Sequence, residues 1–318
     1  MTINSLPRCV VFGEALTDFI LQKDGRWLAQ PGGACWNVAR VVARQGVSTG
    51  FAGAVSQDLF GRQLFDEAAA AGIDTRFMQL LPHSPLLAMV PSGNPPQYFF
   101  VGDDSADLHF DPAALPAGWQ GAAEVLHFGC ISLARQPLAG VLLAEARAAR
   151  AAGKYIAFDP NWRIAMQAPD YRDTFVAMAG LANFIKVSDE DLRGLYPALP
   201  LAAALAELRA LAPLASILLT RGADGLMLLD ASGLWEQPAL PVRLADTVGC
   251  GDAVMGTWLA QRIANPQAHP RSVLHLAARC AALVAARPGA YAPLPAELSA
   301  AEATASDVAT IAAPELLA

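Results

Sequence analysis

Two kinds of segment alternate along this chain. Short runs such as 9–12, 49–56 and 155–160 are apolar without strict alternation, which is typical of strands covered on both faces. Between such runs lie longer segments with apolar positions at helical spacing, such as 59–72 and 138–153. The repeated order of strand and helix predicts a three-layer α/β/α sandwich around a mostly parallel central sheet.

The remaining segments continue this order. A hairpin turn is predicted at Ala231 and Ser232, between two apolar runs. The C-terminal tail, rich in Ala, Ser and Thr, has little periodic signal. Further strands are predicted at 124–132, 184–188 and 216–222, and further helices at 37–46, 171–182, 202–212, 253–264 and 270–286.

Two segments depart from this order. Residues 14–31 and 86–110 alternate apolar and polar residues, with Gly, Asn and Pro at the breaks. This pattern is typical of half-exposed antiparallel strands and predicts a small separate sheet. The predicted domains are therefore a small β domain, formed by 14–31 and 86–110, and a larger α/β domain. The α/β domain comprises 1–13, 32–85 and 111–318.

Composition narrows the class of protein. With 318 residues, 54% hydrophobic and 16% charged, the chain can bury a large core. No apolar run approaches the ~18 residues of a spanning helix, and the N-terminus lacks a secretory pattern. The five cysteines are scattered and never form CxxC, which indicates neither a disulfide framework nor a zinc site. These features predict a soluble cytoplasmic protein without a membrane partner.

Charge and common motifs exclude several functions. The net charge of -7 and the lack of a basic run disfavour nucleic acid as a partner. The chain has no GxxxxGK[ST], and its glycines at 249, 251 and 256 miss GxGxxG. It has no HExxH, and none of its five histidines forms a pair with metal-binding spacing. Each histidine is expected to be structural or on the surface, and a metal-dependent hydrolase is disfavoured.

The stretch DTVGCGDA (246–253) precedes a predicted helix. The first amides of a helix lack intrahelical partners and carry the positive end of the dipole, and glycine lets backbone approach an anion closely. Gly249, Cys250 and Gly251 are therefore expected to direct amides at an anion, with Asp252 beside it. The alternative is that Asp252 is only an N-cap. That alternative is weakened because Met255 at the N3 position gives no capping box.

Two stretches resemble the signatures of the ribokinase-like, or PfkB, carbohydrate kinases. DTVGCGDAVMG resembles the C-terminal signature, and PGGACWNVARVVARQGVSTGFAGAVSQDLFG resembles the N-terminal one. Four shorter pieces, DPNWR, KVSDEDL, TRGADG and PGAYAPLP, resemble those of the fructokinase branch. The resemblance covers almost the whole chain. It implies a ribokinase-like fold and phosphorylation of a sugar by ATP. It also implies that the α/β domain is the nucleotide-binding and catalytic domain and that the small β domain, 14–31 and 86–110, is a lid.

The resemblance also implies a role for each matching residue. Asp252 corresponds to the base that takes the proton from a sugar hydroxyl, and the amides of Gly249, Cys250 and Gly251 to the anion hole. Arg163 corresponds to an arginine directed into the active site. The matching sugar positions are Asp18, Gly32, Gly33, Asn37, Tyr98 and Phe100. The matching ATP positions are Lys186, Ser188, Thr220, Gly222, Gly225, Ala282 and Gly289.

Structural alternatives remain open for some of these residues. Asp18 is alternatively a surface acid, Asn37 a helix cap, and Arg163 the partner of Asp159 in a salt bridge.

Asp252 is expected to have an ordinary pKa near ~3.9, so that its placement matters more than its basicity.

The sequence departs from the family at two places. Ser188 and Asp191 stand where relatives have the Asn and Glu that organise Mg²⁺ through water, which leaves open whether Glu190 or Asp191 takes this role. Mg²⁺ is expected because phosphoryl transfer from ATP needs its charge neutralised, and a monovalent cation is left open. Cys250 stands where many relatives have alanine, and a thiol at a helix N-terminus is expected to have a lowered pKa.

Three hypotheses follow. The first is a fructokinase that phosphorylates the C6 hydroxyl of fructose. The second is 2-keto-3-deoxygluconate kinase, or another sugar or nucleoside kinase of the family. The lid stretch GNPPQYFF has no Arg or Lys, which fructokinases often carry there and which an acidic substrate would need, so this absence weakens both assignments. The third is a non-catalytic sugar-binding homologue, which the glycine setting of Asp252 disfavours. The apolar lid strands 86–90 and 98–101 predict a homodimer through the lid.

Overall fold

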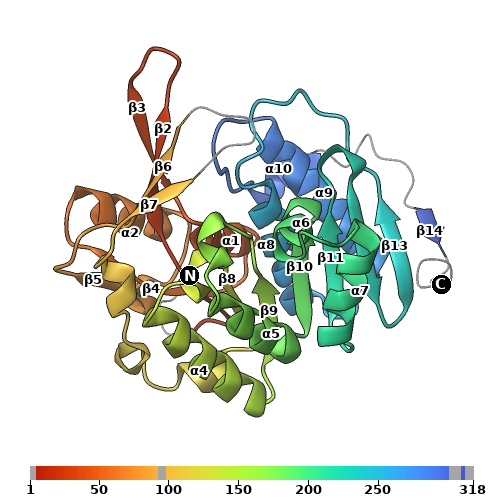
Figure 1. The fold of residues 1–318 in the computed structure, drawn as a ribbon, viewed down its shortest axis with the longest axis horizontal. Helices are drawn as coiled ribbons and strands as arrows, with labels where there is room; N and C mark the ends of the chain where they lie inside the picture. The colour runs from red at the N-terminus through yellow and green to blue at the C-terminus, as the bar shows by residue number, and fades with distance from the viewer. Residues whose placement is uncertain (1–4, 92–97, 301–308, 312–318) are drawn as a thin grey trace.

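A central sheet of ten strands organises the fold (Figure 1). The computed structural model describes residues 5–91, 98–300 and 309–311. The strand order in the sheet is β14-β13-β12-β11-β10-β9-β8-β1-β4-β5. The strands are β1 (Cys9–Phe12), β4 (Thr49–Ser56), β5 (Met78–Leu81), β8 (Val125–Gly129), β9 (Tyr155–Asp159), β10 (Phe184–Ser188), β11 (Ser216–Thr220), β12 (Leu226–Asp230), β13 (Gly233–Gln237) and β14 (Ala309–Ile311).

Parallel pairing runs from β5 to β11, as the sequence predicted. The last strands are antiparallel, and β12 and β13 form the hairpin whose turn is Ala231 and Ser232. Parallel neighbours need a crossover connection, which the helices supply. The helices are α1 (Ala34–Arg44), α2 (Leu59–Ala70), α3 (Trp119–Ala122), α4 (Leu138–Ala151), α5 (Tyr171–Leu181), α6 (Asp189–Leu195), α7 (Leu201–Leu211), α8 (Cys250–Ala264), α9 (Pro270–Ala285) and α10 (Pro295–Ala300).

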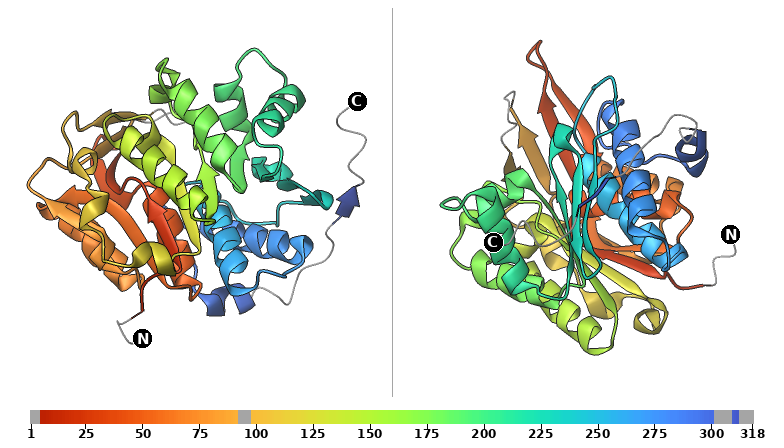
Figure 2. Two further views of the ribbon diagram at one scale, coloured as in Figure 1. Left: turned by 90° about the horizontal axis from the view of Figure 1, so that it is seen from below. Right: turned by 90° about the vertical axis from the view of Figure 1, so that its right-hand side faces the viewer.

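Helices cover both faces of the sheet, which confirms the three-layer sandwich (Figure 2). In β1, Cys9 and Val11 pack into the core with α1, α8 and α9, while Val10 and Phe12 pack into the core with α4 and α5. Aromatic rings fill both cores: Phe12 stacks on Phe128 with centroids 4.9 Å apart. Strands buried on both faces explain why their sequences do not alternate. Six short 3₁₀ helices complete the described elements: η1 (Thr75–Phe77), η2 (Ala106–His109), η3 (Pro112–Ala114), η4 (Cys130–Leu133), η5 (Ile164–Gln167) and η6 (Gly222–Asp224).

A separate four-stranded sheet projects from the body beside α2 (Figure 1). Its order is β3-β2-β6-β7, from β2 (Leu16–Leu21), β3 (Trp27–Gly32), β6 (Leu87–Val90) and β7 (Phe99–Val101). The two outer pairs are antiparallel as predicted, but β2 and β6 are parallel. Both of these strands leave the body at their first residue and run outward together. Residues 92–97 of the predicted lid lie outside the described residues.

Three predicted boundaries were wrong by a few residues. The first helix begins at Ala34 rather than at 37, with Gly33 as its N-cap, and α8 begins at Cys250 rather than at 253. The strand predicted at 124–132 ends at Gly129, where η4 takes over. Glycine-rich stretches carry no apolar periodicity, so the pattern locates helix starts beside them poorly. No helix within the described ranges is both long and apolar enough to cross a membrane.

Candidate active site

Most of the predicted site residues lie where parallel strands of the central sheet end. Asp159, Ser188 and Thr220 are the last residues of β9, β10 and β11, and Ser188 and Thr220 pair in register. In open α/β sheets, this edge is where ligands bind. The N-termini of α1 and α8 meet there as well, because the two helices pack against each other.

The N-terminus of α8 is built around Gly249, which has a φ of 81°. A Cβ on Gly249 would lie 2.8 Å from the backbone of Ala290, so a larger residue does not fit. Asp246, which sequence reasoning gave no role, holds the loop. Its carboxylate accepts from the amide of Val248 at 3.1 Å and from the amide of Gly289 at 2.9 Å.

The amides at this helix end are not all equivalent. Cys250 donates its amide to the carbonyl of Thr247 at 3.2 Å. The amides of Gly249 and Gly251 have no hydrogen-bond acceptor among the residues that the structure describes. The helix dipole therefore adds to two unpaired donors at this point.

Asp252 is the third residue of α8 and is 7% exposed. It is not the N-cap, so that alternative was wrong. Its carboxylate accepts from the amide nitrogen of Asn37 at 2.9 Å. Burial raises the pKa of Asp252 to about 6, although the Asn37 hydrogen bond and the charges of Lys186 and Arg163 act to lower it. The ordinary pKa expected from sequence was therefore wrong, because burial cannot be read from the motif.

Asn37 is the fourth residue of α1, which excludes the cap alternative. Its side-chain nitrogen is used by Asp252, while its Oδ1 is buried with no partner among the described residues. Buried polar atoms are normally paired, so an unpaired acceptor in a cluster of polar side chains indicates a place for a ligand donor.

Lys186 and Asp159 form a buried ion pair below α8. Alternation along β9 and β10 places both side chains on the α8 face of the sheet, and Lys186 Nζ lies 2.9 Å from Asp159 Oδ2. A Cβ on Gly251 would lie 3.0 Å from that Nζ, so the ammonium lies against the start of α8. Burial acts to lower the pKa of Lys186, but attraction to Asp159, Asp191 and Asp252 together with the Asp159 hydrogen bond outweighs it, and the pKa is raised.

Arg163 does not pair with Asp159, so that alternative was also wrong. The guanidinium donates to Oδ1 of Asn161 at 2.8 Å and to the carbonyl of Trp162 at 2.8 Å. It also lies over the ring of Tyr98, 5.0 Å from the centroid. Arg163 therefore connects the end of β9 with the small sheet.

The inner face of the small sheet carries Asp18, which is half-buried and not a surface acid. Burial raises its pKa to about 7, opposed by Arg163 and reinforced by Asp252. A Cβ on Gly32 would lie 2.2 Å from Asp18 Oδ2, so Gly32 makes room for this carboxylate. Gly33, with a φ of 110°, similarly lies against the carbonyl of Glu14.

The aromatic run of the small sheet divides by alternation. Tyr98 and Phe100 are half-buried and pack against the main core. Phe99 and Val101 are 54% and 47% exposed. The structure therefore turns Tyr98 toward Arg163 and Phe99 toward solvent.

At the end of β10, Ser188 and Asp191 form a capping box for α6. Asp191 accepts from the amides of Ser188 and Trp162, both at 2.7 Å. Both of its oxygens are thus used by backbone. Glu190 is exposed, which leaves its carboxylate accessible to a hydrated cation.

The predicted ATP positions lie on neighbouring elements. Gly222 and Gly225 form the turn after β11, with φ of 54° and 85°. A Cβ on Gly225 would lie 2.2 Å from the carbonyl of Gln237. Ala282 lies half-buried on α9, which packs against α8, and Gly289 receives the Asp246 hydrogen bond.

Cys250 behaves differently from the prediction. Burial and the nearby carboxylates of Asp252 and Asp246 raise the pKa of its thiol to about 12. Its sulfur donates to the carbonyl of Ala281 at 3.6 Å, toward α9. A thiol that points into a core is desolvated, and desolvation outweighs the helix dipole here.

Sequence reasoning missed a buried acid, Glu14. It is 1% exposed, accepts from Ser132 Oγ at 2.5 Å and lies near the amide of Cys35 at 3.4 Å. Burial raises its pKa, although the Ser132 hydrogen bond acts to lower it. The only sign of this burial in the sequence was that Glu14 lies inside the apolar run CVVFGEAL.

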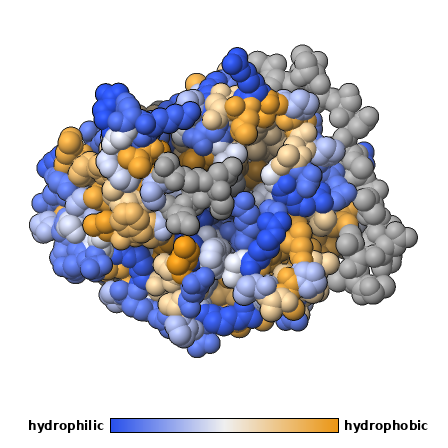
Figure 3. Space-filling model, turned by 45° about the horizontal axis from the view of Figure 1, so that its top comes forward, coloured by the Kyte–Doolittle hydropathy of each residue, from blue (hydrophilic) through white to orange (hydrophobic). Residues whose placement is uncertain are grey.

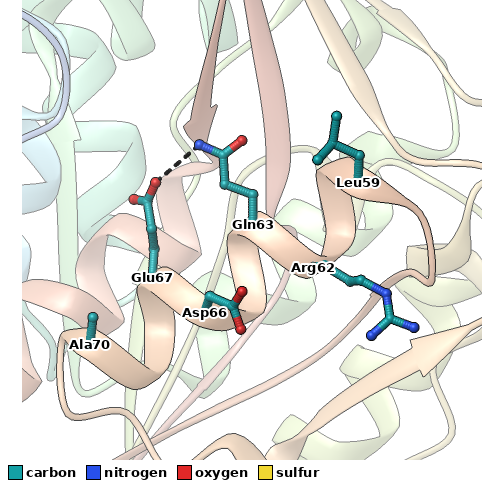
Figure 4. Close-up of a pocket in the computed structure, with 6 residues that line it drawn as sticks. All are labelled: Leu59, Arg62, Gln63, Asp66, Glu67 and Ala70. Atoms are coloured by element: carbon teal, nitrogen blue, oxygen red, sulfur yellow. Dashed lines mark hydrogen bonds between the residues drawn. The ribbon is translucent and has the colours of Figure 1, made fainter.

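Two surface depressions lie away from Asp252. One runs along the outer face of α2, where Gln63 donates to Glu67 at 3.3 Å (Figure 4). A second is lined by residues of β6 and β7, including Phe100. Hydrophobic and hydrophilic residues are interspersed over the face shown in Figure 3. Neither depression includes Asp252, so the candidate site rests on side-chain geometry.

Comparison with known proteins agrees with this geometry. Residues 6–297 match the pfkB family carbohydrate kinase model. The chain is 34% identical to a fructokinase from Klebsiella pneumoniae, covering 90% of this chain and 95% of that protein. An aminoimidazole riboside kinase from Salmonella enterica, solved with aminoimidazole riboside and an ATP analog, is 30% identical with a TM-score of 0.81, covering 92% and 98%. A fructokinase from Vibrio cholerae O395, solved with fructose, ADP and a calcium ion, is 28% identical with a TM-score of 0.82, covering 93% and 99%.

These matches extend across almost the whole of each chain, and they include structures with a sugar or a nucleotide bound. The protein is therefore a phosphotransferase that acts on a sugar hydroxyl and belongs to the pfkB family of carbohydrate kinases.

Proposed function

We propose that the protein is an ATP-dependent fructokinase that transfers the γ-phosphate of ATP to the C6 hydroxyl of fructose. The observation that carries the proposal is Asp252, a buried carboxylate fixed by Asn37 at the N-terminus of α8. A base beside unpaired helix amides joins the two requirements of phosphoryl transfer, proton removal and stabilisation of negative charge.

Asp252 acts as the base. With a pKa of about 6 it is ionised at neutral pH, yet it is a stronger base than an ordinary aspartate. It accepts the proton of the sugar hydroxyl as that oxygen attacks the γ-phosphorus. The Asn37 hydrogen bond keeps the carboxylate oriented during the transfer.

The start of α8 forms the anion hole. Gly249 and Gly251 supply unpaired amides, and Cys250 contributes through the shape of the turn because its own amide donates to Thr247. Lys186 adds a buried positive charge directly beneath Gly251. These groups stabilise the charge on the transferring phosphoryl group.

The sugar lies between α1 and the small sheet. The unpaired Oδ1 of Asn37 accepts a sugar hydroxyl, and Asp18 accepts from neighbouring hydroxyls. Gly32 and Gly33 leave room for the ring, while Tyr98, Phe100 and Arg163 close the opposite side. The half-buried Asp18 and Tyr98 suit a ligand that is partly apolar and rich in hydroxyls.

ATP lies on the other side of α8. Ser188, Thr220, Gly222 and Gly225 lie at the adjoining strand ends, and Ala282 and Gly289 flank the adenine. Mg²⁺ neutralises the phosphates when bound. Glu190 would hold this ion through water, because both oxygens of Asp191 are used by backbone amides.

The small sheet acts as the lid and the dimer contact. We assign residues 14–31 and 86–110 to the lid and the rest of the chain to the α/β domain. Three apolar residues on the outer face of the small sheet are exposed and suit a partner of the same kind: Trp27, Phe99 and Val101. The five free cysteines suit the reducing cytoplasm, where we place the enzyme.

A second substrate class is favoured by one observation. An aminoimidazole riboside kinase is as similar in fold as the fructokinase, with TM-scores of 0.81 and 0.82. A riboside, like fructose, offers a primary hydroxyl to Asp252. Its aminoimidazole ring, however, needs space beside Tyr98. 2-Keto-3-deoxygluconate is less favoured, because Arg163 is already engaged by Asn161 and Trp162.

The test is ADP release from Mg-ATP with fructose, aminoimidazole riboside, 2-keto-3-deoxygluconate and ribose, with Asp252→Asn beside the unchanged protein. We expect turnover with fructose and a loss of about 10²–10⁴-fold in kcat for the variant, with sugar binding retained. Turnover with aminoimidazole riboside alone would make that compound, and not fructose, the substrate. Binding without turnover on every compound would support the non-catalytic homologue instead.

A further inference from the structure

Three side chains outside the candidate site converge at the base of the small sheet. The rings of His83 and His109 stack with centroids 3.6 Å apart. Asp104 lies across one nitrogen of each ring, with its Oδ1 2.6 Å from His109 Nε2 and its Oδ2 3.7 Å from His83 Nδ1. One ligand atom from each residue lies within 4.8 Å of the other two. The sequence had indicated no histidine pair with metal spacing, and the fold creates one.

The backbone beneath these side chains is fixed. Ser84 and Ser105 form a parallel bridge, and Ala106 donates its amide to the carbonyl of Ser84 at 2.9 Å. On the inner side, Arg135 pairs with Asp107 and also donates to the carbonyl of Gly102. The three side chains therefore come from two chain segments whose relative position is already set.

The donor set suits one class of cation. Two imidazoles and one carboxylate are ligands of Zn²⁺, Ni²⁺ and Co²⁺, whereas Mg²⁺ prefers oxygen alone. Stacked rings cannot both point at one ion, so binding requires one ring to tilt. The side chains of His83 and His109 are 31% and 39% exposed, so this tilt meets little packing. Exposure also leaves a coordination position for water.

We propose that His83, Asp104 and His109 form a binding site for a divalent transition-metal cation of the Zn²⁺ class. The site joins the segment that enters β6 with the segment that leaves β7. A bound ion links the two segments that connect these strands to the body. β6 pairs with β2 beside Asp18, so the ion restrains the sheet that holds this residue.

The binding test uses Zn²⁺ with the full chain at neutral pH, in excess Mg²⁺ and without nucleotide. Titration calorimetry is expected to give one Zn²⁺ per chain. His109→Gln and Asp104→Asn are expected to weaken binding at least about tenfold, the loss that even an outer-shell partner causes. His269→Asn is the matched control, because His269 is an exposed histidine away from the cluster and asparagine also caps a helix.

A Co²⁺ spectrum identifies the ligands. Bands of a nitrogen and oxygen site are expected in the unchanged protein and not in His109→Gln. A thiolate charge-transfer band, or a Zn²⁺ affinity in both cluster variants equal to that of the unchanged protein, would place the metal elsewhere and overturn the proposal.

The effect on the small sheet is tested separately. Zn²⁺ is expected to slow hydrogen exchange in β6 and β7 of the unchanged protein but not of His109→Gln. Any effect of Zn²⁺ on turnover would rest on the proposed function, whereas Zn²⁺ binding and hydrogen exchange do not. A kinase assay that fails while Zn²⁺ still binds would therefore count against the proposed function alone. Unchanged exchange with Zn²⁺ bound would overturn the restraint on the sheet.

Discussion

The two sides of the candidate site are held in different ways. Around the start of α8, Asp252, Asn37 and Lys186 are 7%, 7% and 3% exposed, and each has a fixed partner. Across from them, Asp18 is half-buried on the four-stranded sheet, and Tyr98 is half-buried just before strand β7 of that sheet. The outer face of that sheet exposes Trp27, Phe99 and Val101 at 41% to 54%.

The buried side therefore suits the phosphoryl-transfer step, and the small sheet suits the entry and release of the sugar. Groups that transfer a proton or stabilise charge need a dry and fixed environment, and the central sheet supplies one. Groups that admit and release a sugar need an element with fewer buried contacts, and the small sheet supplies that. Substitutions on the α8 side should therefore change stability and catalysis. Substitutions on the outer face of the small sheet should change the oligomeric state.

The largest effect on folding is expected at Lys186. Lys186→Met leaves Asp159 buried without its partner, which should lower the free energy of unfolding by about 3–5 kcal/mol. Urea denaturation measures this loss. The double variant Lys186→Met/Asp159→Leu removes both charges and should recover most of the stability. If the double variant is no more stable than the single one, the buried charge is not the cause.

A smaller effect is expected at Gly249. Gly249→Ala places a side chain at φ 81° and against the backbone of Ala290, which should cost more than the ~1–2 kcal/mol of the left-handed conformation alone. Gly222→Ala is the matched control, since its φ is also positive but nothing lies within 4 Å. We expect Gly249→Ala to lose more stability and to raise the KM for ATP. Equal losses of stability in the two variants would mean that the close approach to Ala290 has no role.

The next effect concerns pH. Asp252 must be ionised to act as a base, so kcat/KM should fall as pH falls through about 6. The Asn37 hydrogen bond lowers this pKa, so Asn37→Ala should move the acid limb to higher pH. Gln45→Ala is the control, because Gln45 also joins α1 to α8, at Thr257, but has no contact with Asp252. An unmoved limb in Asn37→Ala would mean that another group controls it.

The smallest effect on turnover is expected on the outer face of the small sheet. Phe99→Glu introduces a charge into the proposed dimer contact and should convert a dimer into a monomer in analytical ultracentrifugation. Val176→Glu, at an exposed position of α5 far along the chain, should leave the mass unchanged. If Phe99→Glu keeps the mass of the unchanged protein, the contact lies elsewhere.

Local patterns were sufficient for much of the fold. The alternation of apolar strands and amphipathic helices predicted the layers, because strand burial on two faces leaves a direct mark on sequence. Strand directions in the small sheet were less accessible. The parallel pairing of β2 and β6 depends on where two distant segments leave the body, and no local pattern records this.

The candidate site divides in the same way. The glycines at 249 and 251 marked the start of α8, because helix ends and positive φ restrict the residues that fit. The pKa values of Asp252 and Cys250 were predicted wrongly, because burial controls both. Burial depends on what packs around a residue, and the motif does not contain that information.

The sequence by itself determined the family, the layered architecture and the position of the acidic residue behind a glycine-rich helix start. Only the tertiary structure decided which partner each charged group has. Asn37 donates a hydrogen bond to Asp252, 215 positions away in the sequence. Asp159 pairs with Lys186 and not with Arg163. The ring of His83 stacks on that of His109 beside Asp104. The reason is physical: backbone conformation depends on neighbours in the chain, whereas charge and hydrogen bonding depend on neighbours in space.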